Sequence, residues 1–213
     1  MDEKSMKTGT TTLAIKGKDY VVLAADKRAT AGSMIINKKV QKVFKILDNL
    51  GLTVAGNYSD IQLLMKYIKA ELKLKEIRTS KRVNVKEAVN LLATLVYTNL
   101  RQMFPGITQF LVAGFDRHGV HLYDVFPDGS LNEEDEYVCS GSGMVFALGV
   151  LDALYNKNIP LDEAKKLAIK AINAALQRDT ASGEGIDMMV VTKDSVEKVH
   201  TEQLTVRLNE NIK

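Results

Sequence analysis

The order in which strand-like and helix-like segments follow one another constrains the fold of this chain most. Short apolar runs typical of strands are grouped at residues 11–55, 109–140 and 188–200, and segments with helical periodicity come in two pairs between these groups. Grouped strands and grouped helices indicate α+β layering rather than repeated βαβ units. The sequence therefore predicts a four-layer α-β-β-α sandwich, in which two antiparallel sheets are flanked by helix pairs.

Local patterns predict the individual elements. Ser59 and Gln62 have the spacing of a capping box at the start of the first helix, and Asn84 and Glu87 repeat the signal for the second. The apolar stripe of the first helix is expected at Ile61, Leu64, Ile68 and Leu72, and that of the second at Ala88, Leu91, Leu95 and Met103. Two more helices are expected at 145–155 and 161–178, and strands at 11–16, 20–25, 33–37, 43–47, 52–55, 109–115, 120–125, 137–140, 188–192 and 196–200.

Length and composition favour one domain. The 213 residues include three prolines and no Pro/Gly/Ser-rich linker, so we expect a leader at 1–9 and a single domain at 10–213. The net charge of +3 is small and dispersed, which argues against nucleic-acid binding. No apolar run approaches the ~20 residues of a membrane helix, and the leader lacks the apolar stretch of a secretory signal.

The cysteine and histidine content gives no sign of a metal or a cofactor. A single cysteine, Cys139, suits a reducing compartment, and we expect a cytoplasmic protein. The small residues around Cys139 favour a buried strand end over a catalytic thiol. His118, His121 and His200 have no neighbours that would complete a metal site.

Gly9 is followed by three threonines, which suggests how a hydroxyl could be activated. A threonine hydroxyl is a poor nucleophile without an adjacent base, and one known base is the α-amine of the same residue. A free α-amine titrates near ~7.7–8.0, against ~10.4 for lysine, so it can accept a proton near neutral pH. The sequence predicts that cleavage after Gly9 makes Thr10 the working N-terminus, although threonine-rich starts are also common in ordinary strands.

Asp26 and Lys42 are candidates to assist Thr10. Asp26 ends the apolar run 20–25, where a buried carboxylate needs a partner. Lys42 falls on the same face as Val40 and Phe44 if 40–46 is extended. A paired Lys42 near Thr10 would favour a neutral amine and an ionised hydroxyl. The alternatives are an aspartate that starts a turn and a lysine that reaches solvent at a sheet edge.

Three further segments could serve the same site. The glycine-containing segments 55–57 and 140–143 each follow a strand and precede a helix, and backbone N–H groups in such turns can stabilise a developing negative charge. Neither matches a phosphate-binding loop, and the second could be a turn only. The polar segment 178–183 at the end of the last helix is either an ordinary turn or a support for the threonine.

These motifs occur together in one known family. Gly-Thr-Thr-Thr at 9–12, Ala-Ala-Asp-Lys-Arg-Ala-Thr at 24–30, Lys-Val-Gln-Lys-Val-Phe at 39–44, Ala-Gly-Asn-Tyr-Ser-Asp at 55–60, Gly-Ser-Gly at 141–143 and Gln-Arg-Asp-Thr-Ala-Ser-Gly at 177–183 follow in that order. The chain resembles an archaeal-type 20S proteasome β-subunit with its propeptide, from about Gly9 to His200. Leu13-Ala14 replaces the more usual Val-Gly, a conservative change within a strand.

The resemblance implies a set of catalytic residues. Thr10 would be the N-terminal nucleophile, exposed by self-cleavage of the Gly9–Thr10 bond. Asp26 and Lys42 would fill the acid and lysine positions, and Gly56 would supply the oxyanion-hole amide. The hydrogen-bonded cluster around Thr10 would be completed by Ser142, Asp179 and Ser182.

The resemblance also implies a substrate site and no cofactor. Thr30 and Gly56 would pair with the substrate backbone as with an added strand. The pocket for the residue before the cut would be shaped by Ala29, Val40, Val54, Tyr58 and Gln62. These residues are uncharged, so cleavage after apolar residues is expected.

Family membership implies partners as well. Such β-subunits form heptameric rings with other β-subunits, stacked between rings of α-subunits, and their active sites face an inner chamber that admits unfolded polypeptide. A regulatory ATPase is expected on the α-rings. Three rival interpretations remain: the bacterial two-component heat-shock protease, an N-terminal-nucleophile amidohydrolase acting on small amides, and a structural ring subunit that is never processed.

Overall fold

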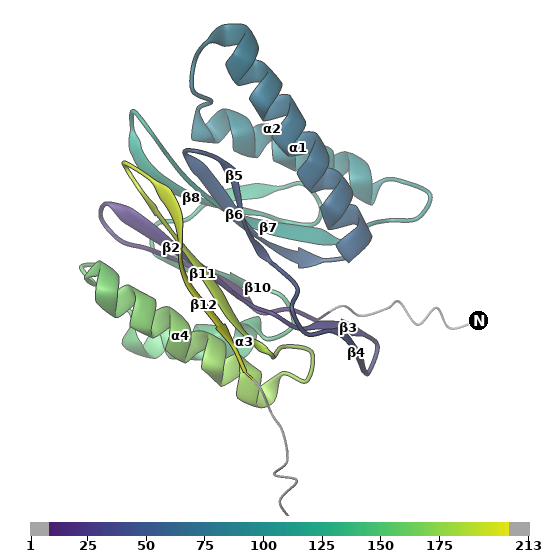
Figure 1. Cartoon of the computed structure of the whole chain (residues 1–213), viewed down its shortest axis with the longest axis vertical. Coiled ribbons are helices and arrows are strands. Elements are labelled where there is room, and N and C mark those ends of the chain that lie inside the picture. The colour runs from purple at the N-terminus through teal and green to yellow at the C-terminus, as the bar shows by residue number, and fades with distance from the viewer. Residues whose placement is uncertain (1–8, 205–213) are drawn as a thin grey trace, which may run out of the picture.

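Two sheets face each other at the centre of the molecule, and each carries a pair of helices on its outer side (Figure 1). The computed structural model describes residues 9–204, so leader residues 1–8 lie outside the described part. The first sheet has the order β10 (Tyr137–Ser140), β1 (Thr12–Lys16), β2 (Tyr20–Asp26), β11 (Gly185–Thr192) and β12 (Val196–Gln203). The second has the order β5 (Val43–Leu47), β6 (Leu50–Gly56), β7 (Thr108–Asp116), β8 (Gly119–Val125) and β9 (Leu131–Glu133). All neighbouring strands are antiparallel.

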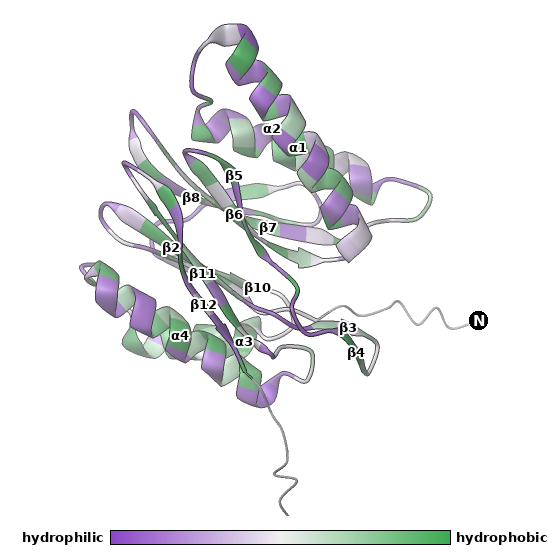
Figure 2. Ribbon diagram, in the orientation of Figure 1, coloured by the Kyte–Doolittle hydropathy of each residue, from purple (hydrophilic) through white to green (hydrophobic). Residues whose placement is uncertain are grey.

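The helices cover the sheets through separate apolar layers. Helices α1 (Tyr58–Thr79) and α2 (Val85–Leu100) bury Ile68 and Leu92 against the second sheet. Helices α3 (Met144–Leu154) and α4 (Leu161–Arg178) bury Leu151 and Ile172 against the first. Hydrophobic and hydrophilic residues alternate along these helices in Figure 2, as expected for helices with one buried face. A third apolar layer, which includes Leu23, lies between the sheets, so the predicted four-layer α+β sandwich is confirmed.

All the predicted helices and strands are present, although several boundaries differ, among them the start of α1 and the end of α2. The expected buried face of α1 is correct, but its N-cap is Asn57 rather than Ser59. The side chain of Asn57 accepts hydrogen bonds from both the backbone N–H and the hydroxyl of Ser59. Helix α2 does have the Asn84–Glu87 capping box, but it ends at Leu100, so Met103 is 89% exposed in the loop that follows.

Two short strands were not predicted. One is β9, and the other is β3 (Ala29–Ala31), which pairs with β4 (Met34–Asn37) as a separate ribbon. This ribbon projects from one end of the sandwich in Figure 1. Within residues 9–204, no helix is both long and apolar enough to cross a membrane.

Candidate active site

Thr10 lies two residues before the start of β1 and is held by the turn that precedes α3. Its backbone N–H donates to Ser142 Oγ at 3.2 Å, and its carbonyl accepts from the Gly143 N–H at 3.3 Å. Gly141 has φ +88°, and a Cβ there would lie 2.1 Å from the Thr10 carbonyl oxygen, so this turn requires glycine. The glycine segment 140–143 therefore holds the backbone of Thr10.

The Gly9–Thr10 peptide bond is intact, and two donors meet at its carbonyl. Thr10 Oγ1 donates to Gly9 O at 2.7 Å, and Lys42 Nζ donates to the same oxygen at 3.3 Å. The Gly9 N–H in turn donates to Thr30 Oγ1 at 3.1 Å. The Thr10 hydroxyl and the Lys42 amino group thus both lie at the carbonyl of the bond that the sequence predicts to be cleaved.

Asp26 and Lys42 form a buried ion pair beside Thr10. Antiparallel pairing of β1 with β2 places Asp26, the last residue of β2, next to Thr11. Lys42 Nζ lies 2.7 Å from Asp26 Oδ1, and the two side chains are 5% and 0% exposed. Burial lowers the pKa of Lys42 below its usual value, and the charge of Asp26 opposes this shift.

Both oxygens of the Asp26 carboxylate accept hydrogen bonds. Besides Lys42, it accepts from the N–H groups of Thr11 at 2.9 Å, Arg28 at 3.0 Å and Gly183 at 2.9 Å. Four donors therefore satisfy the oxygens of this buried carboxylate. The alternative of an isolated, turn-starting aspartate does not fit these contacts.

A second carboxylate organises the hydroxyl groups around Thr10. Asp179 Oδ2 accepts from Ser142 Oγ and from Ser182 Oγ, both at 2.6 Å. Ser182 Oγ also lies 2.6 Å from Thr11 Oγ1. The polar segment after α4, which looked like an ordinary turn in the alternative interpretation, thus reaches Thr10 through Ser142.

A hollow of about 230 Å³ opens next to Thr10. It is lined by four of the predicted pocket residues, Ala29, Val40, Val54 and Tyr58, together with Thr30 and Gly56. Gln62 is exposed on α1 and does not line the hollow, so the structure does not bring this predicted residue to the site. Apart from Arg28 and Lys42, the lining residues are uncharged.

Sequence reasoning missed several residues of this site. Ile36, Asn37 and Ile61 line the hollow as well. The helical pattern predicts Ile61 only as a core residue of α1. Ile36 comes from the β3–β4 ribbon, whose position depends on long-range packing. Thr11, whose N–H binds Asp26, was seen only as part of the threonine run.

Gly56, the proposed oxyanion residue, ends β6 at the rim of the hollow. Its φ is +124°, and a Cβ would lie 2.1 Å from the carbonyl oxygen of Ile107. Only glycine fits this conformation without displacing the start of β7. Gly56 therefore holds the end of β6 beside the hollow that Thr10 also lines.

Comparison with known proteins agrees with this geometry. The family model described as "Proteasome subunit" matches residues 6–191. The chain belongs to the proteasome subunit family. It is an archaeal-type proteasome β-subunit, because curated archaeal β-subunits match it over most of its length.

Three relatives illustrate the match. The chain is 39% identical to "Proteasome subunit beta" of Methanocaldococcus fervens, over 95% of this chain and 90% of that one. It is 43% identical to "Proteasome subunit beta 1" of Hyperthermus butylicus, over 93% and 97%. It is 40% identical to "Proteasome subunit beta" of Methanosphaerula palustris, over 96% of both chains. The chain is therefore a subunit of the multi-subunit proteasome core, and a protease role follows from the family.

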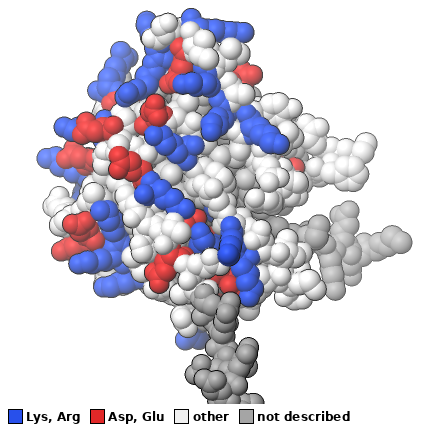
Figure 3. All heavy atoms as spheres, in the orientation of Figure 1, with Lys and Arg blue, Asp and Glu red and all other residues white. Residues whose placement is uncertain are grey.

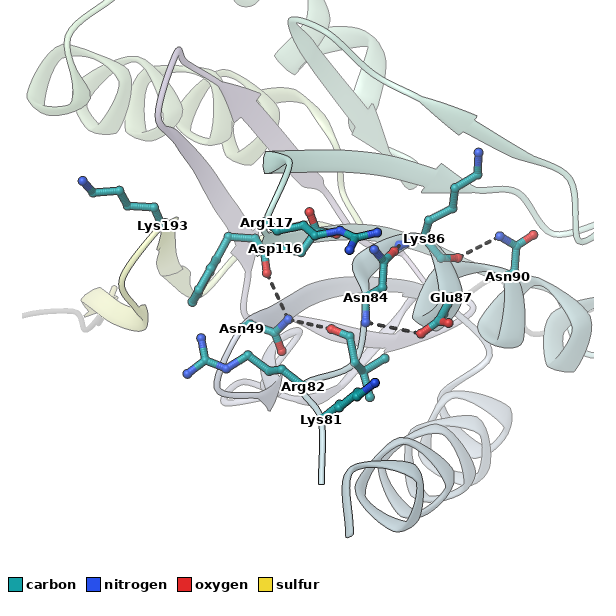
Figure 4. A pocket seen from close by; sticks show the side chains of 12 residues that line it. Asn49, Lys81, Arg82, Asn84, Lys86, Glu87, Asn90, Asp116, Arg117 and Lys193 are labelled. Atoms are coloured by element: carbon teal, nitrogen blue, oxygen red, sulfur yellow. Dashed lines mark hydrogen bonds between the residues drawn. The ribbon is translucent and has the colours of Figure 1, made fainter. Parts of the chain in front are cut away.

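The proteasome subunit has a larger hollow, of about 910 Å³, at the turn ends of β6 and β7, away from Gly56 and Thr10 (Figure 4). Figure 4 shows the charged ends of Lys86 and Lys193 pointing away from each other. Its two carboxylates are engaged elsewhere, since Glu87 pairs with Lys75 at 2.9 Å and Asp116 with His121 at 3.1 Å. This hollow lacks the convergent nucleophile and acid seen around Thr10.

Neither the cysteine nor a metal centre adds to the candidate site in the described residues. Cys139 is buried in β10, and burial raises the pKa of its thiol to about 12, which disfavours a reactive thiolate. Within residues 9–204, no group of three or more His, Cys, Asp or Glu side chains is placed to hold a metal ion.

Proposed function

We propose that this proteasome subunit is a threonine-type endopeptidase with Thr10 as its N-terminal nucleophile after cleavage of the Gly9–Thr10 bond. The observation that carries the proposal is the meeting of Thr10 Oγ1 and Lys42 Nζ at the Gly9 carbonyl oxygen, with Asp26 fixing Lys42. Residues 1–9 would then be a propeptide, and residues 10–213 the mature catalytic domain.

Self-cleavage is the first step. Thr10 Oγ1 attacks the carbonyl carbon of Gly9, the C–N bond to Thr10 breaks, and the Thr10 nitrogen gains the proton that the hydroxyl loses. The product is an ester between Gly9 and Thr10 Oγ1, with a free amine on Thr10. Water hydrolyses this ester, which leaves a carboxylate on Gly9 and restores the hydroxyl.

Peptide cleavage uses the amine released in that step. The amine accepts the Thr10 hydroxyl proton as Oγ1 attacks a substrate carbonyl, and then passes a proton to the leaving amine. The Gly56 N–H would stabilise the negatively charged oxygen, while Lys42, held by Asp26, favours an ionised Oγ1. Water, activated by the same amine, hydrolyses the resulting ester. The residues that hold Thr10 in place are Ser142, Asp179 and Ser182.

The surroundings of Thr10 suit an extended polypeptide. The Gly9 N–H is bound by Thr30, in the place where a substrate backbone would pair with Thr30 and Gly56. The uncharged side chains of Ala29, Val40, Val54 and Tyr58 favour cleavage after apolar residues, with Ile36 as an added wall.

We propose the assembly known for this family for the subunit as well. Stacked heptameric rings of β-subunits between α-rings would enclose the active sites, so that unfolded chains enter and folded proteins do not. A regulatory ATPase would act on the α-rings, and the complex would work in the cytoplasm.

The test is the intact mass and N-terminal sequence of the chain co-expressed with an α-subunit, beside Thr10→Ala. A wild-type N-terminus at Thr10 with an unprocessed variant supports the proposal. Retention of residues 1–9 in an assembled wild-type particle refutes it, and favours a structural ring subunit. Processed particles that cleave small amides but no polypeptide would point to an amidohydrolase instead.

A further inference from the structure

The segment 179–184, between α4 and β11, lacks a helix or strand of its own, yet three contacts of the site depend on it. Ser182 Oγ lies at Thr11, Asp179 holds Ser142, and the Gly183 N–H donates to Asp26 Oδ2 at 2.9 Å. The Gly183 carbonyl accepts from the N–H of Lys27 at 3.0 Å. The position of this segment therefore affects both carboxylates of the site.

Arg28 spans the segment. Its Nη1 donates to the carbonyl of Thr180 at 2.9 Å, and its Nη2 donates to Glu184 Oε1 at 3.1 Å. The guanidinium lies against Gly183, where a Cβ would be 2.3 Å from Arg28 Cζ. The backbone N–H of Arg28 also donates to Asp26 Oδ2. Arg28 therefore contacts both segment 179–184 and the Asp26 carboxylate to which that segment donates.

Glu184 adopts a backbone conformation that glutamate rarely adopts. Its φ is +69°, in the left-handed region, and among the described non-glycine residues only Ser80 shares a positive φ. The side chains of Glu184 and Arg28 are 12% and 22% exposed at their ion pair. A residue held in a strained conformation with a partly buried ion pair beside an active site suggests a functional reason for the strain.

We propose that Arg28 and Glu184 are positioning residues, whose ion pair fastens segment 179–184 over the end of β2 and so sets the contacts of Asp26 and Thr11. This role rests on the proposed function and extends it to two residues outside the catalytic set. Neither side chain has a hydrogen bond to Thr10 or Gly9 among the described contacts. Glu184 would act through the segment, whereas Arg28 also lines the hollow and lies close enough to Lys42 to affect its charge.

The first test substitutes Glu184→Gly in the full-length chain co-expressed with an α-subunit. Glycine accepts φ +69° without strain but cannot bind Arg28. We expect kcat and the rate of processing at Gly9 to fall roughly tenfold or more, because small displacements of catalytic groups slow the reaction strongly. KM should be unchanged, because Glu184 does not line the hollow. The melting temperature should be unchanged or higher, because relief of strain offsets the lost ion pair.

Ser80→Gly is the matched control. Ser80 has φ +52° at the C-cap of α1, outside the site, so glycine relieves the same kind of strain there. We expect an equal or higher melting temperature with unchanged kcat. A purely structural role of Glu184 would make the two variants behave alike.

Variants of Arg28 provide a second readout. The charged groups that face Lys42 are Asp26, Asp179, Arg28 and, after processing, the Thr10 amine. Burial is the main cause that lowers the pKa of Lys42, and the like charge of Arg28 lowers it further. Arg28→Met should therefore reduce kcat and move the alkaline limb of the pH–rate profile to higher pH. Arg28→Lys keeps the charge, so it should reduce kcat while the alkaline limb stays in place.

The outcomes separate the two proposals. If wild type is processed and active, and Glu184→Gly has the same kcat, the positioning role is refuted while the proposed function stands. If KM alone changes, the pair contributes to substrate binding, and the positioning role is again refuted. If assembled wild type is neither processed nor active, the proposed function fails and the positioning role fails with it.

Discussion

Asp26 has more partners than any other side chain of the candidate site, and each comes from a different part of the chain. Thr11, Arg28, Lys42 and Gly183 all donate to it. The sequence predicted the pairing with Lys42, because a buried carboxylate and a buried lysine each need a partner. It could not predict the backbone donors. The Thr11 donor depends on how β1 pairs with β2, and the Gly183 donor depends on the position of the segment after α4.

Asp26→Asn should therefore destabilise the fold as well as abolish processing. An amide cannot balance the buried Lys42, and breaking a buried ion pair costs about 3–5 kcal/mol. Denaturant unfolding should show this loss. Asp135→Asn, which breaks the Lys16 pair at a carboxylate that is 87% exposed, should cost less than about 1 kcal/mol. Equal losses in the two variants would contradict the buried, charged pair.

Asp124 should make stability depend on pH. Burial raises its pKa to about 6, so between about pH 4 and pH 6 the folded state keeps a proton that the unfolded state has lost. Stability should fall as pH rises through this window, by an amount on the order of 2 kcal/mol relative to Asp124→Asn. The asparagine still accepts from Gln109, and Asp128→Asn serves as an exposed control. A difference between wild type and Asp124→Asn that does not change with pH would refute this.

At the scale of elements, periodicity predicted most where one element has one buried face. Helix α4 begins and ends where its pattern predicted, at Leu161 and Arg178, and one face of it is buried. Strands β3 and β9 have three residues each, too few for a periodic signal, and their pairing depends on distant partners. For the same reason the sequence did not predict Ile36 as a lining residue, because its place at the hollow depends on the position of the β3–β4 ribbon.

The start of α1 can be tested directly. Asn57 supplies the cap oxygen for Ser59, so Asn57→Ala should cost about 1 kcal/mol of stability. Ser59→Ala leaves that cap in place and should cost less. Thermal unfolding of both variants distinguishes the observed cap from the predicted one, and a larger loss for Ser59→Ala would favour the prediction from sequence.

At the scale of the whole molecule, charged and uncharged surface are separated on the face that Figure 3 shows. Figure 3 shows Lys, Arg, Asp and Glu gathered over the left side and upper edge, while the right side, where the β3–β4 ribbon and the 101–107 loop project in Figure 1, is mostly uncharged. Met103 and Phe104 of that loop are 89% and 85% exposed, and Ile36 of the ribbon is 61% exposed. A subunit of a multi-subunit core is expected to cover such residues on assembly.

Replacing Met103 and Phe104 together by serine should thus weaken assembly without unfolding the subunit. Neither side chain contributes to the core, so the melting temperature of the isolated chain should change little. Native mass spectrometry with an α-subunit should show fewer complete particles. Ile77→Ser, which removes a 67% exposed side chain from α1, is the comparison. Undiminished assembly of the double variant would show that the loop stays exposed.

The intact Gly9–Thr10 bond has a kinetic consequence. In the proposed self-cleavage, the attacking oxygen and the bond that it breaks belong to the same chain, so processing would be a unimolecular event that each chain performs once. In assembled particles its half-time should then be independent of dilution and of added peptide substrate. Peptide cleavage would then begin only after a lag that starts when the site is complete. The length of this lag would be set by the rate of processing and not by the concentration of particles.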